Sequence, residues 1–416
     1  MGAPKVVVVG GGIAGLGFAL SMAQRGLACD VYEAVPEVKA LGVGITLLPH
    51  AMRELAALGV QPQLEAAGIE NLESVFYNRY GQFIYRELRG RHAGYALPEI
   101  GIHRGTLHRI LWDQTLATIG AGHLHTGHRC TGVEQHSQGA TAHFCGPDGT
   151  PRASVPADIV IACDGVNSAV RRQFYPDEAL AFAGINTWRG VTVHPPILTG
   201  KSYLRVGSIE TGKMVIYPIV DDVDGQGGQL INWMAEIQGD RAVMNDWNQH
   251  GDRADFEAIY ADWRFPWLDV TRLIADAQQV LEYPMVDKDP VAQWTFGRVT
   301  LMGDAAHPMY PRGSNGSAQG LIDARTLAEL LATMADPLEA LACYEQQRAP
   351  ATARIVQTNR TTPPDYINTR VDQLSGGQPF RHIDDVISQD ELRRISEDYK
   401  RIAGFSQASP EAPTGR

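Results

Sequence analysis

The sequence lacks the patterns that mark membrane and exported proteins. No stretch approaches the roughly 18 consecutive apolar residues of a transmembrane helix, so we expect no membrane crossing. The opening MGAPKVVVVGGGIAG has no basic segment followed by a cleavable apolar one, and Val6 stands where a myristoylation signal requires Ser or Thr. The resulting expectation is a cytoplasmic protein without a membrane partner.

Cysteine pairs and an excess of positive charge are missing as well. The five cysteines are scattered and include no CxxC pair, which predicts reduced thiols and no metal site. A net charge of -11 disfavours attraction to phosphate backbones, so we expect no nucleic-acid partner. The 416 residues exceed the roughly 250 to 300 that one core usually supports, which predicts at least two domains.

Residues 5–34 have the order of a strand, a helix and a second strand. Four valines at 6–9 are typical of a buried strand, a G-x-G-x-x-G pattern follows, and apolar residues then recur at helical spacing. In such a pattern the first glycine allows a tight turn, the second lets a diphosphate approach the main chain, and the third lets helix and strand pack closely. The residues of this predicted nucleotide loop are Gly10, Gly12, Ile13, Ala14 and Gly15.

Glu33 closes the second strand of this unit, eighteen residues after Gly15. A carboxylate at that place accepts hydrogen bonds from ribose hydroxyls and repels a 2'-phosphate. The pattern therefore predicts FAD or an NAD-like nucleotide, and not NADP, at this loop. The alternative is a tight turn followed by an unrelated glutamate.

Two later segments repeat the order of buried strand, glycine, acid and helix. In ADIVIACDGVNSAVR, Asp164 follows a strand and, taken alone, is read more readily as a turn with a helix cap. In RVTLMGDAAHPMYPRGSNG, Asp304 can accept from a sugar-alcohol chain, while the glycine-rich loop and the next helix start direct amides at an electron-poor ring. His307 is interpreted as structural, holding this loop. A long cap and loop is the alternative.

These three segments together resemble the single-component flavoprotein aromatic hydroxylases, the family that includes para-hydroxybenzoate hydroxylase. The resemblance covers about residues 5–355 and rests on the first glycine pattern with Glu33, on CDGVNSAVR and on GDAAHPMYPRGSNG. Further stretches are similar to the bacterial phenazine-carboxylate hydroxylase and pyridine-ring oxygenase branch: LGVGITLLPHAMRELAALGV, GIHRGTLHRIL, TWRGVT and YPMVDKDPVAQW. The W-x-W-x-I-P signature of halogenases on this fold is absent.

The resemblance implies FAD held without a covalent bond. Glu33 would bind the adenosine ribose, the first glycine loop and Arg104 the diphosphate, and Asp304 the ribityl chain. Asp164 is linked in this family to transient binding of NADH or NADPH, for which the chain has no second G-x-G-x-x-G unit. For Arg104, at a helix start, the alternative is a solvated charge. The amides implied to lie against the flavin ring are those of Gly44, Gly313, Ser314 and Asn315, but Arg312 and Ser314 depart from the family's glycines, so the charge beside the ring is not transferable.

The fold class expected is α/β, with a doubly wound Rossmann-type FAD-binding domain and a mixed or antiparallel substrate sheet. The former comprises residues 1–70, 98–178 and 286–355, and the latter 71–97 and 179–285. Residues 356–416 form a C-terminal helical segment with a disordered tail, packed on the FAD domain or on a second subunit. The protein is then a monomer or a homodimer.

The stretch 184–237 consists of short alternating strands. In GQLINWMAEI, Ile231, Trp233, Ala235 and Ile237 share one face and polar residues the other, which predicts an antiparallel sheet covered on one side that roofs the flavin. Residues 221–228, DDVDGQGG, are interpreted as a mobile hairpin.

The family's chemistry implies that NADH or NADPH reduces FAD and that dioxygen then forms a C4a-hydroperoxide. This species hydroxylates a small aromatic or N-heteroaromatic substrate, with or without loss of a carboxylate. A general base or a cation that stabilises a phenolate is expected, and the candidates are Tyr217 and Arg189. Each has an alternative, as a core tyrosine and as an arginine bridging domains. Two rival functions stay open, a flavin dehydrogenase or reductase without oxygen transfer and a non-catalytic flavin-binding module.

Overall fold

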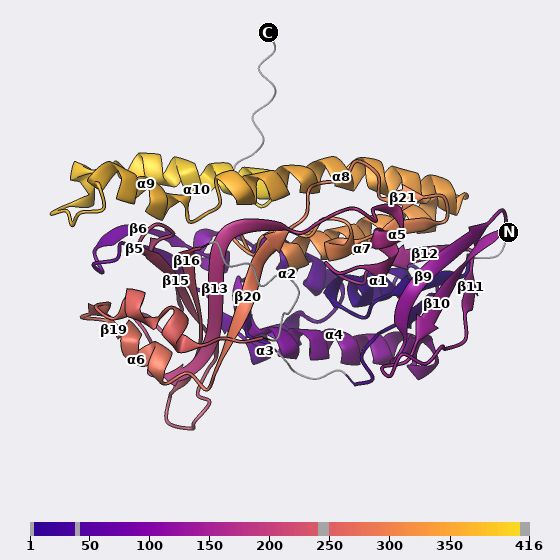
Figure 1. The fold of residues 1–416 in the computed structure, drawn as a ribbon, viewed down its shortest axis with the longest axis horizontal. Coiled ribbons are helices and arrows are strands. Elements are labelled where there is room, and N and C mark those ends of the chain that lie inside the picture. The colour runs from indigo at the N-terminus through magenta and orange to yellow at the C-terminus, as the bar shows by residue number, and fades with distance from the viewer. Residues whose placement is uncertain (1–3, 38–41, 240–248, 408–416) are drawn as a thin grey trace, which may run out of the picture.

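Two sheets of different character organise the chain (Figure 1). The computed structural model describes residues 4–37, 42–239 and 249–407. The predicted α/β class is confirmed, since a mainly parallel sheet flanked by helices adjoins a mainly antiparallel one. The predicted disordered tail falls largely on residues 408–416, which lie outside the described residues.

The parallel sheet is built around strands whose residues are buried on both faces. Its strand order is β21-β22-β12-β1-β2-β8, and β21 alone runs antiparallel to its neighbour. The valines of β1 are all buried, as expected for a central strand with helices on both sides. The bounds are β1 Val6–Val9, β2 Asp30–Tyr32, β8 Leu124–His125, β12 Ile159–Ala162, β21 Thr295–Phe296 and β22 Val299–Leu301.

Helices and two small sheets complete this half of the molecule. Helix α1 packs against both α4 and α7, and a three-stranded sheet of β9, β10 and β11 lies at the right edge in Figure 1. The bounds are α1 Ile13–Ala23, α2 Pro49–Ala57, α3 Gln61–Ala67, α4 Arg104–Ile119, α5 Ala169–Phe174, β9 Arg129–His136, β10 Gly139–Cys145 and β11 Val155–Ala157; the second small sheet contains β3 Gly44–Leu47, β4 Ile69–Glu70 and β7 Ile100–His103.

The second large sheet has eight strands in the order β17-β20-β13-β16-β15-β14-β5-β6. All its pairings are antiparallel except that of β14 with β5. The bounds are β5 Glu73–Tyr77, β6 Phe83–Leu88, β13 Ala181–His194, β14 Ser202–Ser208, β15 Gly212–Val220, β16 Gln229–Gln238, β17 Gln249–His250 and β20 Gln279–Asp287; nearby lie β18 Arg264–Phe265, β19 Leu268–Asp269 and α6 Val270–Ala275.

The prediction that this sheet is covered on one side is wrong, because both of its faces are buried. Trp233 packs with Phe256, Leu273 and other apolar residues of the segment that carries α6. On the opposite face, Asn232 and Glu236 are also buried, and β15 packs against β7 of the other half. The polar residues there have partners from distant parts of the chain instead of solvent.

Four C-terminal helices connect the two halves. They are α7 Gly316–Thr333, α8 Pro337–Thr361, α9 Tyr366–Ser375 and α10 Gln389–Ala403. Helices α8, α9 and α10 run along one long side of the molecule and cover both sheets (Figure 1). Helix α10 packs on α8 and α9, and α9 on β5 and β14. The C-terminal segment is thus part of the same folded body.

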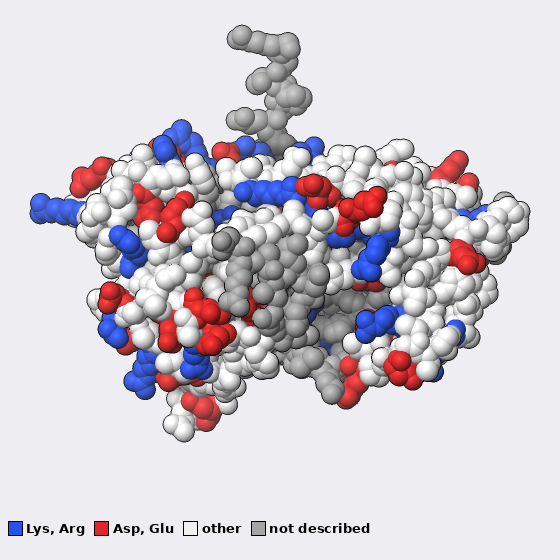
Figure 2. Space-filling model, in the orientation of Figure 1, with Lys and Arg blue, Asp and Glu red and all other residues white. Residues whose placement is uncertain are grey.

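The face of the molecule seen in Figure 2 carries charges of both signs. Figure 2 shows acidic and basic side chains interspersed on the face in view, without an extended patch of one sign. Within the described residues, no helix has both the length and the apolar composition needed to span a bilayer. Nor do the described residues include a cluster of His, Cys, Asp and Glu able to hold a metal ion.

Candidate active site

The three predicted glycine and acid segments meet at one edge of the parallel sheet. Val9 pairs with Tyr32 on one side and Ala162 on the other, and Ala162 pairs with Leu301. Each of these residues ends its strand, so the segments that follow them leave the sheet side by side. Such a row of strand ends is where ligands bind in open α/β sheets.

The first glycine loop is shaped by close contacts. Gly10 has a φ of +103°, and a side chain there would overlap the carbonyl oxygen of Cys163. A side chain at Gly15 would overlap the Gly10 carbonyl. Gly12 is different, since a methyl group added there would meet nothing within 4 Å. The main chain before α1 therefore faces open space, next to helix amides that no side chain caps.

The side chains that follow the loop serve packing. Ile13 packs against the core formed by α1, α2 and α4, and the Ala14 methyl lies between Gly303 and Gly320. A methyl group on Gly303 would approach Ala14 Cβ to 2.9 Å. The first and third segments are therefore in direct contact.

Glu33 lies at the end of β2 and its carboxylate reaches back to the glycine loop. One oxygen accepts from the Gly11 amide at 2.7 Å and the other from the Val35 amide at 2.9 Å. Each carboxylate oxygen keeps a further lone pair for a ligand hydroxyl. Glu33 thus orders the loop and leaves acceptor capacity at its rim.

Arg104 and Asp304 form a loosely coupled pair of opposite charges. Arg104 begins α4, is exposed, and has no ion pair within the described part of the chain. Asp304 is exposed too, yet the surrounding protein raises its pKa, an effect that His307 and Arg104 oppose. The cause is that the neighbouring protein displaces water around the carboxylate, which disfavours its charged form. Its Oδ1 lies 3.8 Å from where a Gly316 side chain would begin, at the amino end of α7.

Asp164 makes the helix cap that its sequence also allowed. Its Oδ2 accepts from the amides of Ala169 at 2.8 Å and Val170 at 3.4 Å, at the start of α5. Its Oδ1 is buried without a partner among the described residues, and burial raises its pKa. Oδ2 therefore caps the helix, whereas Oδ1 still requires a proton or a hydrogen-bond donor.

Arg171 joins the second and third segments, a role that the sequence did not reveal. The side chain is fully buried and donates to the carbonyls of Ala305 at 3.0 Å and Ala306 at 2.6 Å. It also forms an ion pair with Glu178. The only signal in the sequence is an arginine two turns after Asp164, which resembles an ordinary helix-surface residue.

His307 has the structural role expected for it. Its Nε2 lies 2.5 Å from Asp323 of α7, and Arg348 of α8 approaches the other oxygen of Asp323 at 2.7 Å. Burial opposes ionisation of Asp323, but His307 and Arg348 outweigh it and lower its pKa to about 2. Asp323 also accepts from the Gly303 amide at 3.2 Å. The cluster of His307, Asp323 and Arg348 therefore fixes the segment that carries Asp304 onto α7 and α8.

The loop of Gly313, Ser314 and Asn315 is held by the C-terminal helices. A side chain at Gly313 would overlap the Tyr399 hydroxyl of α10, and Ser314 adopts a positive φ of +53°. Arg312 pairs with Asp365 at 2.9 Å, and Asp365 pairs with Lys213 at 2.6 Å. The positive charge of Arg312 is therefore neutralised beside the C-terminal segment.

Gly44 lies where the two halves touch. Its amide donates to Asn232 Oδ1 at 2.7 Å, and a side chain there would lie 2.8 Å from Ile219 and Asn232. Asn232 is fully buried, and its Nδ2 has no partner in the described part of the chain. Glycine is needed at 44 because the eight-stranded sheet approaches the main chain so closely.

Tyr217 and Arg189 share the face of the large sheet that looks toward β3 and β7. Tyr217 is buried and stacks on Tyr203 with ring centroids 4.8 Å apart. Burial raises its pKa, so its hydroxyl stays protonated at neutral pH and acts as a donor before it acts as a base. Arg189 lies 4.7 Å from the centroid of Tyr283, is half-buried, and has no carboxylate partner among the described residues.

Arg205 is a second cation on this face and was not anticipated. Its guanidinium lies between the rings of Tyr203 at 4.5 Å and Phe76 at 5.0 Å, and it is 7% exposed. No acid neutralises it within the described residues, and its hydrogen bond goes to Ser74. The signal in the sequence that could have revealed this cation is a lone arginine within the stretch SYLRVG.

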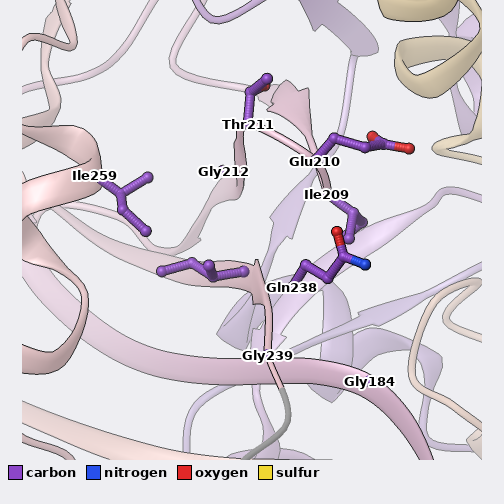
Figure 3. Close-up of a pocket in the computed structure, with 9 residues that line it drawn as sticks. Gly184, Ile209, Glu210, Thr211, Gly212, Gln238, Gly239 and Ile259 are labelled. Carbon is purple, nitrogen blue, oxygen red and sulfur yellow. The ribbon is translucent and has the colours of Figure 1, made fainter.

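A further pocket lies at the turn between β14 and β15, beside Gly184 of β13 and the end of β16. Its volume is about 650 Å³, and three glycines leave much of its wall to the backbone (Figure 3). None of the predicted site residues lines it. The lining residues are Gly184, Ile209, Glu210, Thr211, Gly212, Ile237, Gln238, Gly239 and Ile259.

The first site fits a dinucleotide flavin. The open Gly12 main chain, Arg104 (which has no ion pair among the described residues) and the acceptors Glu33 and Asp304 are complementary to the diphosphate, ribose and ribityl parts of FAD. The fold and this site define a doubly wound, dinucleotide-binding α/β protein with a second sheet over the site. The chain belongs to the FAD-binding-domain family of the class A flavin aromatic hydroxylases, whose model matches residues 4–359.

Individual relatives agree with this membership. The chain is 37% identical over 367 residues to a phenazine 1,6-dicarboxylic acid hydroxylase of Lysobacter antibioticus, covering 85% of this chain and 89% of the relative. It is 31% identical to 3-amino-4-hydroxybenzoate 2-monooxygenase of Streptomyces cremeus, covering 98% of each. Klebsiella pneumoniae HpxO complexed with FAD and uric acid shares the fold, with a TM-score of 0.76, 24% identity and 97% of each chain covered. The predicted family, FAD cofactor and enzyme class are confirmed.

Proposed function

We propose that this chain is an NADH- or NADPH-dependent FAD monooxygenase that hydroxylates a small aromatic or N-heteroaromatic compound, with or without loss of a carboxylate. The observation that carries the proposal is the register of β1, β2, β12 and β22, which brings Glu33, Asp164 and Asp304 to one sheet edge. FAD, when bound, supplies the redox chemistry with the nicotinamide and dioxygen.

The binding roles proposed for the chain's residues follow from their chemistry. Glu33 accepts from the adenosine ribose, and the Gly12 main chain with Arg104 binds the diphosphate. Asp304 accepts from the ribityl hydroxyls, and the Gly313–Asn315 loop with Gly44 borders the ring. The partnerless Oδ1 of Asp164 is available to the transient nicotinamide cosubstrate.

On the substrate side, we assign Arg189 to an anionic group of the substrate and Tyr217 to a hydrogen bond with a ring substituent. Arg189 has no acid of its own in the described residues, and its Nε lacks an acceptor. Apolar neighbours on the same face, including Val215, Ile219 and Met234, exclude water from the reacting carbon. Relatives named for dicarboxylic acid and hydroxybenzoate substrates support an anionic aromatic.

A direct test is NADH and NADPH oxidation by the purified yellow protein, measured with and without a panel of carboxylated and hydroxylated aromatic rings. We expect at least one ring compound to accelerate flavin reduction. Uniformly slow reduction across the panel would favour a non-catalytic flavin-binding module. We also propose that the enzyme works in the cytoplasm as a monomer or a homodimer, which size-exclusion chromatography with light scattering distinguishes.

A further inference from the structure

The C-terminal helix α10 contributes a buried tyrosine to the loop that follows Asp304. The family model ends at residue 359, so α10 lies beyond the part of the chain that it matches. Tyr399 of this helix is 4% exposed, and its hydroxyl contacts Gly313 so closely that only a hydrogen fits there. Helix α10 therefore contacts the predicted flavin loop directly, through the Tyr399 side chain.

A chain of hydrogen bonds passes through the Tyr399 hydroxyl. Asn315 Nδ2 donates to it at 2.8 Å, and the hydroxyl donates to Asn359 Oδ1 of α8 at 2.9 Å. Asn359 Nδ2 then donates to the Tyr310 carbonyl at 3.3 Å. At the other end, His50 Nε2 of α2 lies 2.8 Å from Asn315 Oδ1. We call this set, from His50 to the Tyr310 carbonyl, the hydrogen-bond relay.

The relay has one consistent direction. Asn315 Nδ2 is committed as a donor, to Tyr399 and to the Gly313 carbonyl at 3.1 Å, so its Oδ1 must accept from His50. His50 is then protonated on Nε2, and its buried Nδ1 has no partner in the described residues. Hydrogen bonds that point the same way polarise one another. The relay thus holds the loop at the Gly313 carbonyl and the preceding segment at the Tyr310 carbonyl.

The segment after α10 reinforces this arrangement. Phe405 stacks on the His50 ring with centroids 4.8 Å apart and planes 4° from parallel. The Phe405 carbonyl accepts from the Tyr95 hydroxyl at 2.7 Å. The carbonyl of Ala403 accepts from Gln319 of α7 at 3.4 Å. The C-terminal segment thus contacts the loop, α2 and α7, the three elements that surround Asn315.

We propose that Tyr399 is a positioning residue for the flavin, acting through Asn315 and Gly313. By fixing the loop, it fixes the amino end of α7, whose positive dipole favours the negative charge that a flavin gains on reduction. The inference rests on the flavin placement given under Proposed function. It adds that residues beyond the matched family region set the affinity and the reduction potential of the cofactor.

The test compares Tyr399→Phe with Tyr260→Phe as a matched control. Tyr260 is buried as well, and its hydroxyl donates to the carbonyls of Lys213 at 3.0 Å and Glu236 at 3.3 Å, but it packs on the face of the large sheet opposite to Tyr217. For each variant, the FAD dissociation constant of the apoprotein, the flavin midpoint potential and the melting temperature are measured. We expect Tyr399→Phe to raise the dissociation constant about 5- to 10-fold, the effect of one or two lost hydrogen bonds, and to make the potential more negative. Tyr260→Phe should lower only the melting temperature.

A second variant tests the relay as a unit. Asn359→Ala removes the acceptor of the Tyr399 hydroxyl and should shift the potential in the same direction, with the double variant no worse than the more affected single one. If both Tyr399→Phe and Asn359→Ala keep the wild-type dissociation constant and potential, the inference is overturned. None of these readouts needs a substrate. Failure of the wild type to bind FAD would instead overturn the proposed function.

Discussion

At the scale of single residues, the acids and cations around the sheet edge differ in how fully the protein satisfies them. Glu33 bonds two amides of its own chain, whereas Arg104, Arg189 and Arg205 have no carboxylate partner within the described residues. Burying or crowding an unpaired charge is costly unless a ligand completes its interactions. These cations are therefore the residues whose replacement should affect ligands more than folding.

Replacing Glu33 by Ala should weaken FAD binding by about 1.5 to 3 kcal/mol, the usual contribution of a hydrogen bond to a charged group. Part of the loss comes from the freed Gly11 amide, because Glu33 also orders the glycine loop. Titration of the apoprotein with FAD measures the effect. Asp30→Ala is the control, since Asp30 lies on the same strand and pairs with His123. Equal FAD affinity in the two variants would refute the role of Glu33.

Replacing Arg189 by Ala should raise KM for an anionic aromatic substrate about 10- to 150-fold, because a charged hydrogen bond contributes about 1.5 to 3 kcal/mol. FAD affinity should not change, since Arg189 lies on β13 of the eight-stranded sheet and not on the parallel sheet. Arg189→Lys keeps the charge without the planar geometry and should restore part of the affinity. Steady-state kinetics measure KM, at saturating NADH or NADPH, whichever the wild type oxidises. An unchanged KM would leave Arg189 as a bridge between the halves.

At the scale of elements, local sequence patterns were sufficient to predict the first strand-helix-strand unit and the strands before Asp164 and Asp304. Each of those signals lies within one short segment. The second face of the large sheet could not be predicted, because Asn232 and Glu236 read as solvent-facing. Their partners are the Gly44 amide and Lys213, and the former lies 188 residues away. A local alternation cannot distinguish solvent from a distant partner.

The contact between α10 and the loop of Gly313, Ser314 and Asn315 was likewise only partly predictable. The sequence indicated a charged C-terminal helix and left its packing surface open. Tyr399 appears there as one aromatic residue among charged ones, and nothing local links it to Asn315, 84 residues earlier. The family resemblance, not periodicity, supplied most of the residues predicted to bind FAD. It did not extend to the helix that supports them.

His50 should make the packing of α2 against the Asn315 loop and the C-terminal segment sensitive to acid. Burial lowers its pKa to about 4 from the ordinary 6.5, because a charged ring would lose its hydration. The unfolded chain takes up this proton below pH 6.5 and the folded chain only near pH 4, so stability is full above pH 6.5 and falls as the pH drops toward 4. Between pH 7 and 5, the wild type should lose about 2 kcal/mol more than His50→Gln, which retains a donor for Asn315. Urea unfolding of the apoprotein at both pH values measures this difference; equal losses would contradict it.

At the scale of the whole molecule, the two large sheets contribute different parts of the proposed site. The parallel sheet offers a nucleotide-binding edge, and the antiparallel sheet presents Tyr217 and Arg189 toward it across Gly44 and β7. The C-terminal helices lie along both halves and hold them together (Figure 1). This arrangement suits a reaction that must keep water away from an activated oxygen while a small ring is held in place.

The most direct test of the central claim is turnover under ¹⁸O₂ with the aromatic compound that best accelerates flavin reduction. A monooxygenase incorporates one labelled atom into the ring product and stops when dioxygen is removed. We predict one ¹⁸O atom in each product molecule and no product under anaerobic conditions. Product formed without dioxygen, or bearing oxygen from water, would contradict the account and identify a flavin dehydrogenase on the same fold.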